Sequence, residues 1–152
     1  MLKAFIAASC LALATLAGPA VALAAKPEIY TPAFSKVAVE GYDPVAYFTQ
    51  SKPVKGTEAF STTYKGAEYR FVSAANLARF KAAPATYAPQ FGGYCAWAVS
   101  QNYTAKGAAQ YWRIVNGKLY LNYNADIQKK WEKNIPGLIA QGNANWPTVL
   151  QK

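Results

Sequence analysis

The sequence YWRIVNGKLYL at residues 111–121 predicts a β-hairpin. Residues 111–115 and 118–121 are rich in aromatic and branched apolar side chains, which favour strands. Asn116-Gly117 stands between them and suits a type I′ turn, because both central positions of that turn need a positive φ. We therefore expect two antiparallel strands that meet at this dipeptide.

A second hairpin is expected upstream. Residues 58–64 and 67–71 form the two predicted strands, and Lys65-Gly66 forms the turn. In residues 67–71, apolar and charged side chains alternate, as they do in a strand with one buried face.

A helix is expected after each hairpin. Ser73 is a suitable N-cap for a helix over 74–83, and Asn124 is a suitable N-cap for a helix over 125–134. Each predicted helix stops before a proline. The predicted fold class is α+β: a small twisted antiparallel sheet formed by the two hairpins, with the helices packed on one face.

The two hairpin–helix segments share a spacing, which suggests a degenerate repeat. The alternative is chance, because one identity beyond the turn glycine supports the match. The equivalent positions are Gly66, Tyr69, Ser73 and Phe80 in the first segment, and Gly117, Tyr120, Asn124 and Trp131 in the second.

The remaining elements are expected to be short. We predict a strand at 36–40, a turn at 41–44 and an apolar segment at 45–49. Residues 95–101 are expected to form a short helix, and residues 136–150 a loose helix with a docking segment.

Residues 1–24 have the pattern of a signal peptide. Lys3 precedes an apolar run that ends at Pro19, and small residues before position 25 suit a cleavage site after Ala24. The run is shorter than the roughly 20 residues that a spanning helix needs. We expect an exported protein, periplasmic or secreted and not membrane-spanning, with an extended arm at 25–35 and a single domain at 36–152.

The formal charge of the chain is +9, from 16 basic and 7 acidic residues. The basic residues are scattered, with a single run at Lys129-Lys130, and no nucleic-acid-binding motif accompanies them. We therefore expect no nucleic acid as a partner. A weak preference for acidic partners or anionic surfaces is the alternative to a plain basic protein.

Cys95 is the one thiol expected in the exported chain, because Cys10 lies in the predicted leader. Histidine is absent, and Met1 is the one methionine. Catalysis through a Ser-His-Asp or Cys-His arrangement is therefore excluded, and so is an intrachain dithiol. Any chemistry that needs a soft or reactive side chain must use Cys95.

The sequence resembles the YHS domain family. The residues that carry the resemblance are GYDPVAYF at 41–48, then Tyr64-Lys65-Gly66, Tyr69, Phe71, Ser73, Asn76, Phe80, Pro84 and Tyr87. The segments Tyr94-Cys95-Ala96, 117–122 and Trp146-Pro147 are similar to an exported branch, the YHS domain-containing (seleno)proteins. The resemblance implies a small α+β fold, and redox chemistry if selenocysteine stands at the position of Cys95 in relatives.

Metal-binding members of the family carry three cysteines, and this chain departs from them. The matching positions hold Ala46, Val72 and Asn76, none of which binds a soft metal ion. The family's metal clip is therefore not expected here. No cofactor is required by the sequence; Cu(I) at Cys95, or shared between the thiolates of two chains, is an alternative.

Cys95 has two interpretations. Gly92 and Gly93 precede it, and a helix start there would favour a thiolate and leave room for a ligand beside Tyr94, Cys95 and Trp97. Cys95 would then contact a ligand or act as a catalytic nucleophile. Alternatively, Cys95 is a buried apolar residue among aromatic neighbours.

Three functions follow from these interpretations. The first is an exported accessory or binding protein, in which the Gly-Gly-Tyr-Cys segment contacts a small ligand, a metal in transit or a partner protein. The second is a one-Cys thiol-dependent redox enzyme. The third is a structural or interaction module with an inert Cys95. The sequence names no substrate and no oligomeric state.

Overall fold

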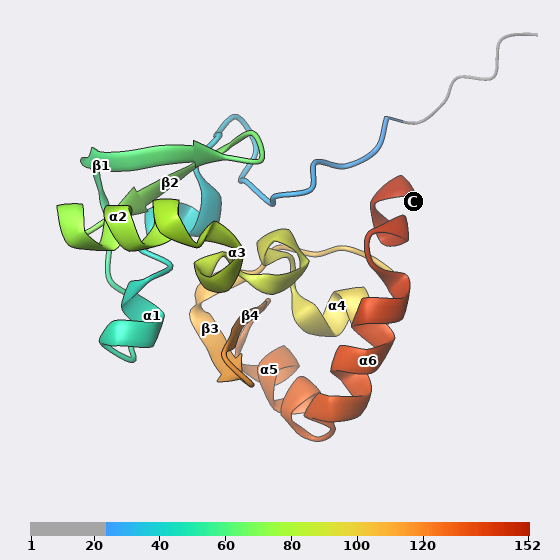
Figure 1. Ribbon diagram of the computed structural model, residues 1–152. Coiled ribbons are helices and arrows are strands. Elements are labelled where there is room, and N and C mark those ends of the chain that lie inside the picture. Colours follow the sequence, from blue (N-terminus) through green and yellow to red (C-terminus); the bar gives the residue numbers. More distant parts are fainter. Residues whose placement is uncertain (1–23) are drawn as a thin grey trace, which may run out of the picture.

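Two β-hairpins, separated and flanked by short helices, make up residues 24–152, the part of the chain that this computed structural model describes. The predicted signal peptide lies outside the described residues, apart from Ala24. In chain order the elements are η1 (Ala38–Gly41), α1 (Ala46–Thr49), β1 (Thr57–Tyr64), β2 (Ala67–Phe71), α2 (Ala74–Ala82), α3 (Pro84–Tyr87), η2 (Gln90–Gly93), α4 (Ala96–Ser100), β3 (Ala108–Val115), β4 (Lys118–Asn122), α5 (Ala125–Glu132), α6 (Ile135–Asn145) and η3 (Thr148–Gln151) (Figure 1).

Both hairpins and the α+β class are confirmed. The hairpins form two separate two-stranded antiparallel sheets, β1–β2 and β3–β4, instead of one continuous sheet. The reason lies at their free edges. Val37 makes a parallel bridge to Glu68 on β2, and Cys95 makes a parallel bridge to Leu121 on β4. The segment that leads into each hairpin thus covers an edge that a second hairpin could otherwise have joined.

Both predicted helix caps are also confirmed. Oγ of Ser73 accepts a hydrogen bond of 3.1 Å from the N–H of Asn76, and Oδ1 of Asn124 accepts one of 2.9 Å from the N–H of Ile127. These bonds satisfy N–H groups that the first turn of a helix leaves without partners. They fix where α2 and α5 begin, directly after their hairpins.

The repeat extends well beyond the hairpin and helix. We call residues 38–82 the first unit and residues 90–132 the second unit. Each contains a short 3-10 turn, a short helix, a hairpin and a capped helix. The strands of the hairpins have the same lengths, 8 and 5 residues, and the same register irregularity four residues into the pairing, at Thr57/Ser61 and Ala108/Trp112.

The backbone of the two turns η1 and η2 matches closely. Val39, Glu40 and Gly41 have φ values of 53°, 53° and 80°, and the residues of η2 that correspond to them have 53°, 60° and 82°. The next N–H groups bond alike: Asp43 donates to the carbonyl of Val54 at 2.8 Å, and Cys95 donates to that of Ala105 at 2.9 Å. Asp43 and Cys95 are therefore equivalent positions.

The predicted strand at 36–40 is wrong. Val37 alone forms a bridge, and Ala38–Gly41 form η1. The positive φ values of Val39 and Glu40 turn the backbone away from an extended path, which the alternating valines did not reveal. In the tail, the helical segment is longer than a loose turn, since α6 runs from Ile135 to Asn145.

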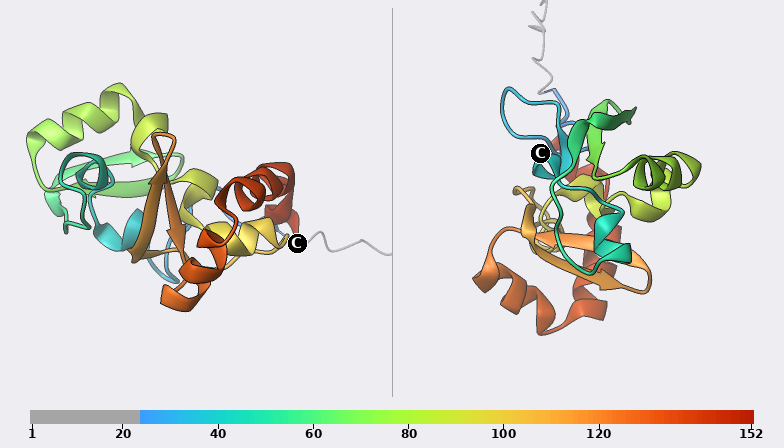
Figure 2. Two further views of the ribbon diagram at one scale, coloured as in Figure 1. Left: turned by 90° about the horizontal axis from the view of Figure 1, so that it is seen from below. Right: turned by 90° about the vertical axis from the view of Figure 1, so that its left-hand side faces the viewer.

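Strand β4 lies between two apolar cores. Leu119 and Leu121 face the core of the first unit, whereas Tyr120 faces a second core that includes Trp131. Figure 2 shows the second hairpin between the first unit and the helices α4, α5 and α6. A strand buried on both faces joins the two units into one body.

The N-terminal arm and the C-terminus lie together. The N–H of Lys26 donates to the carbonyl of Leu150 at 2.8 Å, and the N–H of Tyr30 donates to that of Gly92 at 2.9 Å. The arm thus crosses the second unit before the first unit begins (Figure 1). Within the described residues, no helix has the length and apolarity that a membrane crossing requires.

Candidate functional site

Cys95 is the N-cap residue of α4, which confirms a short helix in this segment. Its relative exposure is 0 %, so the thiol does not face bulk solvent in this structure. The bridge to Leu121 on β4 holds it against the second hairpin. Burial of this kind is ordinary for a cysteine and does not by itself indicate a function.

Polar groups nevertheless surround the sulfur. Sγ of Cys95 donates to Oδ1 of Asn122 at 3.7 Å, and the backbone N–H groups of Trp97, Ala98 and Tyr123 lie near enough to favour the charged form of the sulfur. Burial raises the pKa of the Cys95 thiol, and these N–H groups act in the opposite direction but do not outweigh burial. The neutral thiol is therefore the favoured form at neutral pH.

A pocket of about 280 Å³ adjoins Cys95. Most of its wall is apolar or aromatic, which suits a small molecule with little polar surface. The residues that line it are Cys95, Trp97, Ala98, Tyr103, Ala105, Tyr123, Asn124 and Ile127.

Two lysines lie against aromatic rings that line this pocket. Tyr103 and Tyr123 are 45 % and 43 % exposed, which is high for such large side chains. Nζ of Lys106 lies 5.4 Å from the ring centroid of Tyr123, and Nζ of Lys130 lies 5.7 Å from that of Trp97. Two positive charges therefore lie near the aromatic wall of the pocket, where they could attract an anionic group.

Gly92, Gly93 and Tyr94 do not line this pocket. A Cβ added to Gly92 would lie 1.7 Å from the carbonyl oxygen of Glu28, and Oη of Tyr94 donates to the carbonyl of Pro27 at 2.9 Å. The segment that packs closely against the backbone of Gly92 is therefore the protein's own N-terminal arm. Of the residues proposed from sequence for ligand contact, the structure brings Cys95 and Trp97 together at the pocket.

The clip positions Ala46, Val72 and Asn76 gather around Asp43. The N–H groups of Ala46 and Val72 and Nδ2 of Asn76 all donate to its carboxylate. At the positions where the sequence resemblance would place a metal clip, the structure thus has an internal network of hydrogen bonds. Among residues 24–152, no group of three or more His, Cys, Asp or Glu side chains is placed to hold a metal ion.

The same positions in the second unit are Ala98, Tyr123 and Ile127, and all three line the Cys95 pocket. Sequence reasoning missed Tyr123 and Ile127, as well as Tyr103. The repeat held the signal, because the spacing that relates Ser73 to Asn124 also relates Val72 to Tyr123 and Asn76 to Ile127.

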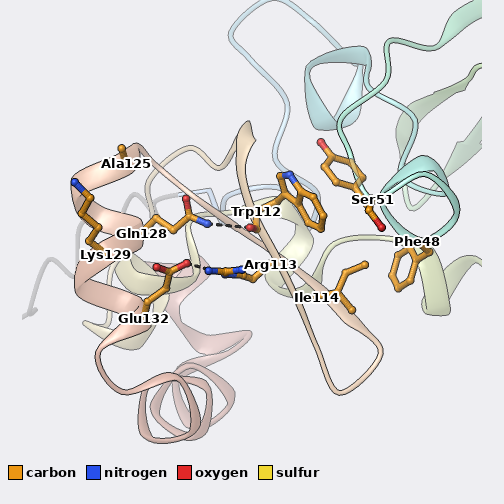
Figure 3. Close-up of a pocket in the computed structure, with 10 residues that line it drawn as sticks. Phe48, Ser51, Trp112, Arg113, Ile114, Ala125, Gln128, Lys129 and Glu132 are labelled. Carbon is orange, nitrogen blue, oxygen red and sulfur yellow. Dashed lines mark hydrogen bonds and ion pairs between the residues drawn. The ribbon is translucent and has the colours of Figure 1, made fainter.

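A larger cleft of about 710 Å³ lies between α1, β3 and α5 (Figure 3). Nε2 of Gln128 donates to the carbonyl of Trp112 at 2.9 Å, and Nε of Arg113 donates to Oε1 of Glu132 at 2.7 Å. These polar groups are already paired with one another. We therefore assign this cleft no ligand.

The comparisons with known proteins place the first unit in a family. The family model of the YHS domain matches residues 45–91, a span that runs from the start of α1 to η2. No curated protein and no solved structure gives a significant match to the chain. Residues 45–91 of this chain are therefore a YHS domain, which includes α1, both strands of the first hairpin and α2.

Proposed function

We propose that this protein is an exported binding protein, and that its second unit holds a small apolar or aromatic molecule with an anionic group in the pocket beside Cys95. The observation that carries the proposal is the pocket itself: an apolar and aromatic wall, with two lysines against the rings of Tyr123 and Trp97 that line it. Apolar contact would supply most of the affinity, and the lysines would select for negative charge.

The relation between the two units supports this location. In the first unit, Nδ2 of Asn76 bonds to the Asp43 carboxylate at 2.7 Å and closes the space beside it. In the second unit, Ile127 stands at the position of Asn76 and makes the wall apolar. The same framework therefore offers a closed polar network in one unit and an open apolar pocket in the other.

Binding is favoured over thiol catalysis by the state of Cys95. A nucleophilic cysteine needs a substantial thiolate fraction, which a depressed pKa provides. Here burial raises the pKa of the thiol. We therefore place Cys95 in the wall of the pocket and assign it no catalytic role.

Cu(I) transfer is the weaker candidate. Cu(I) prefers two or more soft ligands, and Cys95 is one sulfur with an amide neighbour. Export rests on the leader pattern of residues 1–24. Fractionation of cells that express the full chain tests it, with recovery of a shortened protein from the periplasm or medium as the expected result.

Titration with the anionic dye anilinonaphthalene sulfonate tests the binding site. We expect a saturable rise in fluorescence with a single class of sites. Ala105→Phe, which fills the pocket from its rim, should abolish that rise. Ala75→Phe, an equal change at an exposed position of α2, should leave it intact. Saturable binding that persists in Ala105→Phe, or the absence of saturable binding in the wild type, would refute the proposal.

A further inference from the structure

In the first unit, the carboxylate of Asp43 accepts hydrogen bonds from four donors. The N–H groups of Val45 and Ala46 donate to Oδ1 at 2.8 and 3.3 Å. The N–H of Val72 and Nδ2 of Asn76 donate to Oδ2 at 2.9 and 2.7 Å. Asp43 is fully buried, so these donors take the place of the water that its charge would otherwise require.

The backbone N–H groups at the equivalent positions lie near Cys95 in the second unit, but its thiol makes no capping hydrogen bond to α4. These N–H groups are those of Trp97, Ala98 and Tyr123, which we call the amide cradle. A thiol is a weak acceptor with one sulfur atom, whereas a carboxylate offers two charged oxygens to its donors. The N–H groups of the amide cradle thus surround a neutral thiol, whereas the equivalent N–H groups of the first unit bind the carboxylate anion of Asp43.

Asn122 gives a second and independent indication, because its buried amide beside the thiol has a donor that lacks an acceptor among residues 24–152. Its side chain has a relative exposure of 0 %, and its Oδ1 lies 3.7 Å from Sγ of Cys95 and accepts from the N–H of Trp97 at 3.3 Å. Its Nδ2 has no hydrogen-bond partner within the described residues. Phe71 stands at the equivalent position of the first unit, so the second unit has gained a buried amide beside the sulfur, and Nδ2 of that amide lacks an acceptor in the described part of the chain.

We propose that Cys95 is an oxidation site, at which peroxide converts the thiol to a sulfinate that the amide cradle and Asn122 hold as the first unit holds Asp43. A sulfinate on Cβ has the shape of an aspartate side chain, with sulfur in place of the carboxyl carbon. It carries one negative charge and two acceptor oxygens, which match the donors described above.

The chemistry needs two molecules of hydrogen peroxide. In the first step sulfur attacks one peroxide oxygen, the O–O bond breaks, an S–O bond forms and water leaves, which gives a sulfenic acid. The second peroxide oxidises sulfur again in the same way and releases a second water. The sulfinic acid then loses its proton and becomes the sulfinate. Sulfur loses four electrons in total, and each peroxide gains two.

Access favours this product over a disulfide. The pocket of about 280 Å³ leads to Cys95, and a molecule as small as peroxide can enter it. Because Cys95 has a relative exposure of 0 %, either reagent needs a local opening of the pocket wall, and peroxide needs a much smaller opening than a tripeptide thiol such as glutathione. Burial also raises the pKa of the thiol, so oxidation should be slow, but the product should be well held.

This inference goes beyond the proposed binding function, and either can fail without the other. Dye titration tests the pocket, whereas oxidation is measured by mass. The purified protein is treated with hydrogen peroxide in the presence of glutathione and then digested. We expect the peptide that contains Cys95 to gain two oxygen atoms, and Cys95→Ser to show no gain at this position. An unmodified Cys95, or a glutathione adduct there, would overturn the proposal.

Two isosteric variants test the cradle directly. Cys95→Asp supplies a carboxylate, which can accept hydrogen bonds from the N–H groups of the amide cradle. Cys95→Asn has the same shape, but its NH₂ group is a donor and cannot accept from those N–H groups. We expect Cys95→Asp to melt at the higher temperature, against the usual preference of a buried site for the neutral side chain. Cys95→Asn melting at the same or a higher temperature would overturn the proposal. The peroxide experiment uses the wild type, so it decides the matter even if neither variant folds.

Discussion

The carboxylate of Asp43 accepts a hydrogen bond of 2.7 Å from Nδ2 of Asn76, and both side chains are buried. This bond ties the turn before α1 to the first turn of α2. The same carboxylate caps the N–H groups of Val45 and Ala46, which agrees with a turn-forming role for Asp43. Four donors depend on this one carboxylate, so its loss should affect the stability of the first unit strongly.

Asp43→Ala should therefore be strongly destabilising. It leaves two buried backbone N–H groups, the part-buried N–H of Val72 and the buried amide of Asn76 without their acceptor. Each buried donor that loses its partner costs about 1–3 kcal/mol, so we expect a total loss of at least about 3 kcal/mol. Urea denaturation measures this free energy. Glu58→Ala, at an exposed ion pair with Arg70, is the control and should cost below about 1 kcal/mol.

Stability should fall at alkaline pH. Burial raises the pKa of Tyr47 and of Tyr69 above the ordinary value for tyrosine, which is about 10. Above that pH the unfolded chain releases protons that the native state keeps, so the native state binds more protons and the free energy of unfolding decreases. The stability that these two tyrosines contribute is fully present below about pH 10, and it is lost as the pH rises through their pKa values in the native state.

Replacement of each tyrosine separates two effects. The hydroxyl of Tyr69 has no hydrogen-bond partner among residues 24–152, whereas that of Tyr47 donates to the carbonyl of Ala109 at 2.9 Å. Tyr69→Phe should raise stability at neutral pH by about 1 kcal/mol and flatten the alkaline loss. Tyr47→Phe should lower stability at neutral pH by a similar amount. Denaturation curves from neutral to alkaline pH check this, and a Tyr69→Phe that is less stable than the wild type would contradict it.

The two lysines beside the pocket should select for charge. Lys106→Ala and Lys130→Ala should each weaken binding of the anionic dye by roughly 2- to 5-fold, which corresponds to a partly screened pair of charges. Binding of the neutral dye Nile red should change little, because the apolar wall is intact. The loss should also shrink at high salt. An equal loss for both dyes would show that the lysines support the pocket by packing and not by charge.

Gly92→Ala should detach the N-terminal arm. Gly92 has φ +60°, and an added Cβ would lie 1.7 Å from the carbonyl oxygen of Glu28. Gly66 has φ +81° but no atom within 4 Å of such a Cβ, so Gly66→Ala pays for the backbone conformation alone, about 1 kcal/mol. We expect Gly92→Ala to cost more and to expose Tyr30 to chymotrypsin. Equal costs with an uncut arm would show that the arm contributes little.

The hairpins and helix caps could be predicted because their causes are local. Asn116-Gly117 specifies its turn, and Ser73 and Asn124 accept bonds from residues three positions along the chain. The left-handed turn at Val39 had no such signal, since branched residues seldom adopt a positive φ. This turn is held by the packing of Val39 in the core of the first unit.

The environment of Cys95 could not be predicted from its neighbours in the sequence. Its burial depends on β4, through Leu121 and Asn122, and its pocket depends on Tyr103 and Tyr123. These residues come from separate elements that meet only in the folded chain. The repeat was the one clue that linked them, and its extension to η2 and α4 required the backbone geometry.

The contact between Lys26 and Leu150 brings the start and end of the described chain to one place. A short linker could therefore join them, and new ends could be opened at the exposed turn of Asn116-Gly117. Such a circular permutant would keep every contact within the first unit and open the second unit at a point where the chain has few neighbours. Its folding would show that the order in which the two units leave the ribosome does not determine the structure they reach.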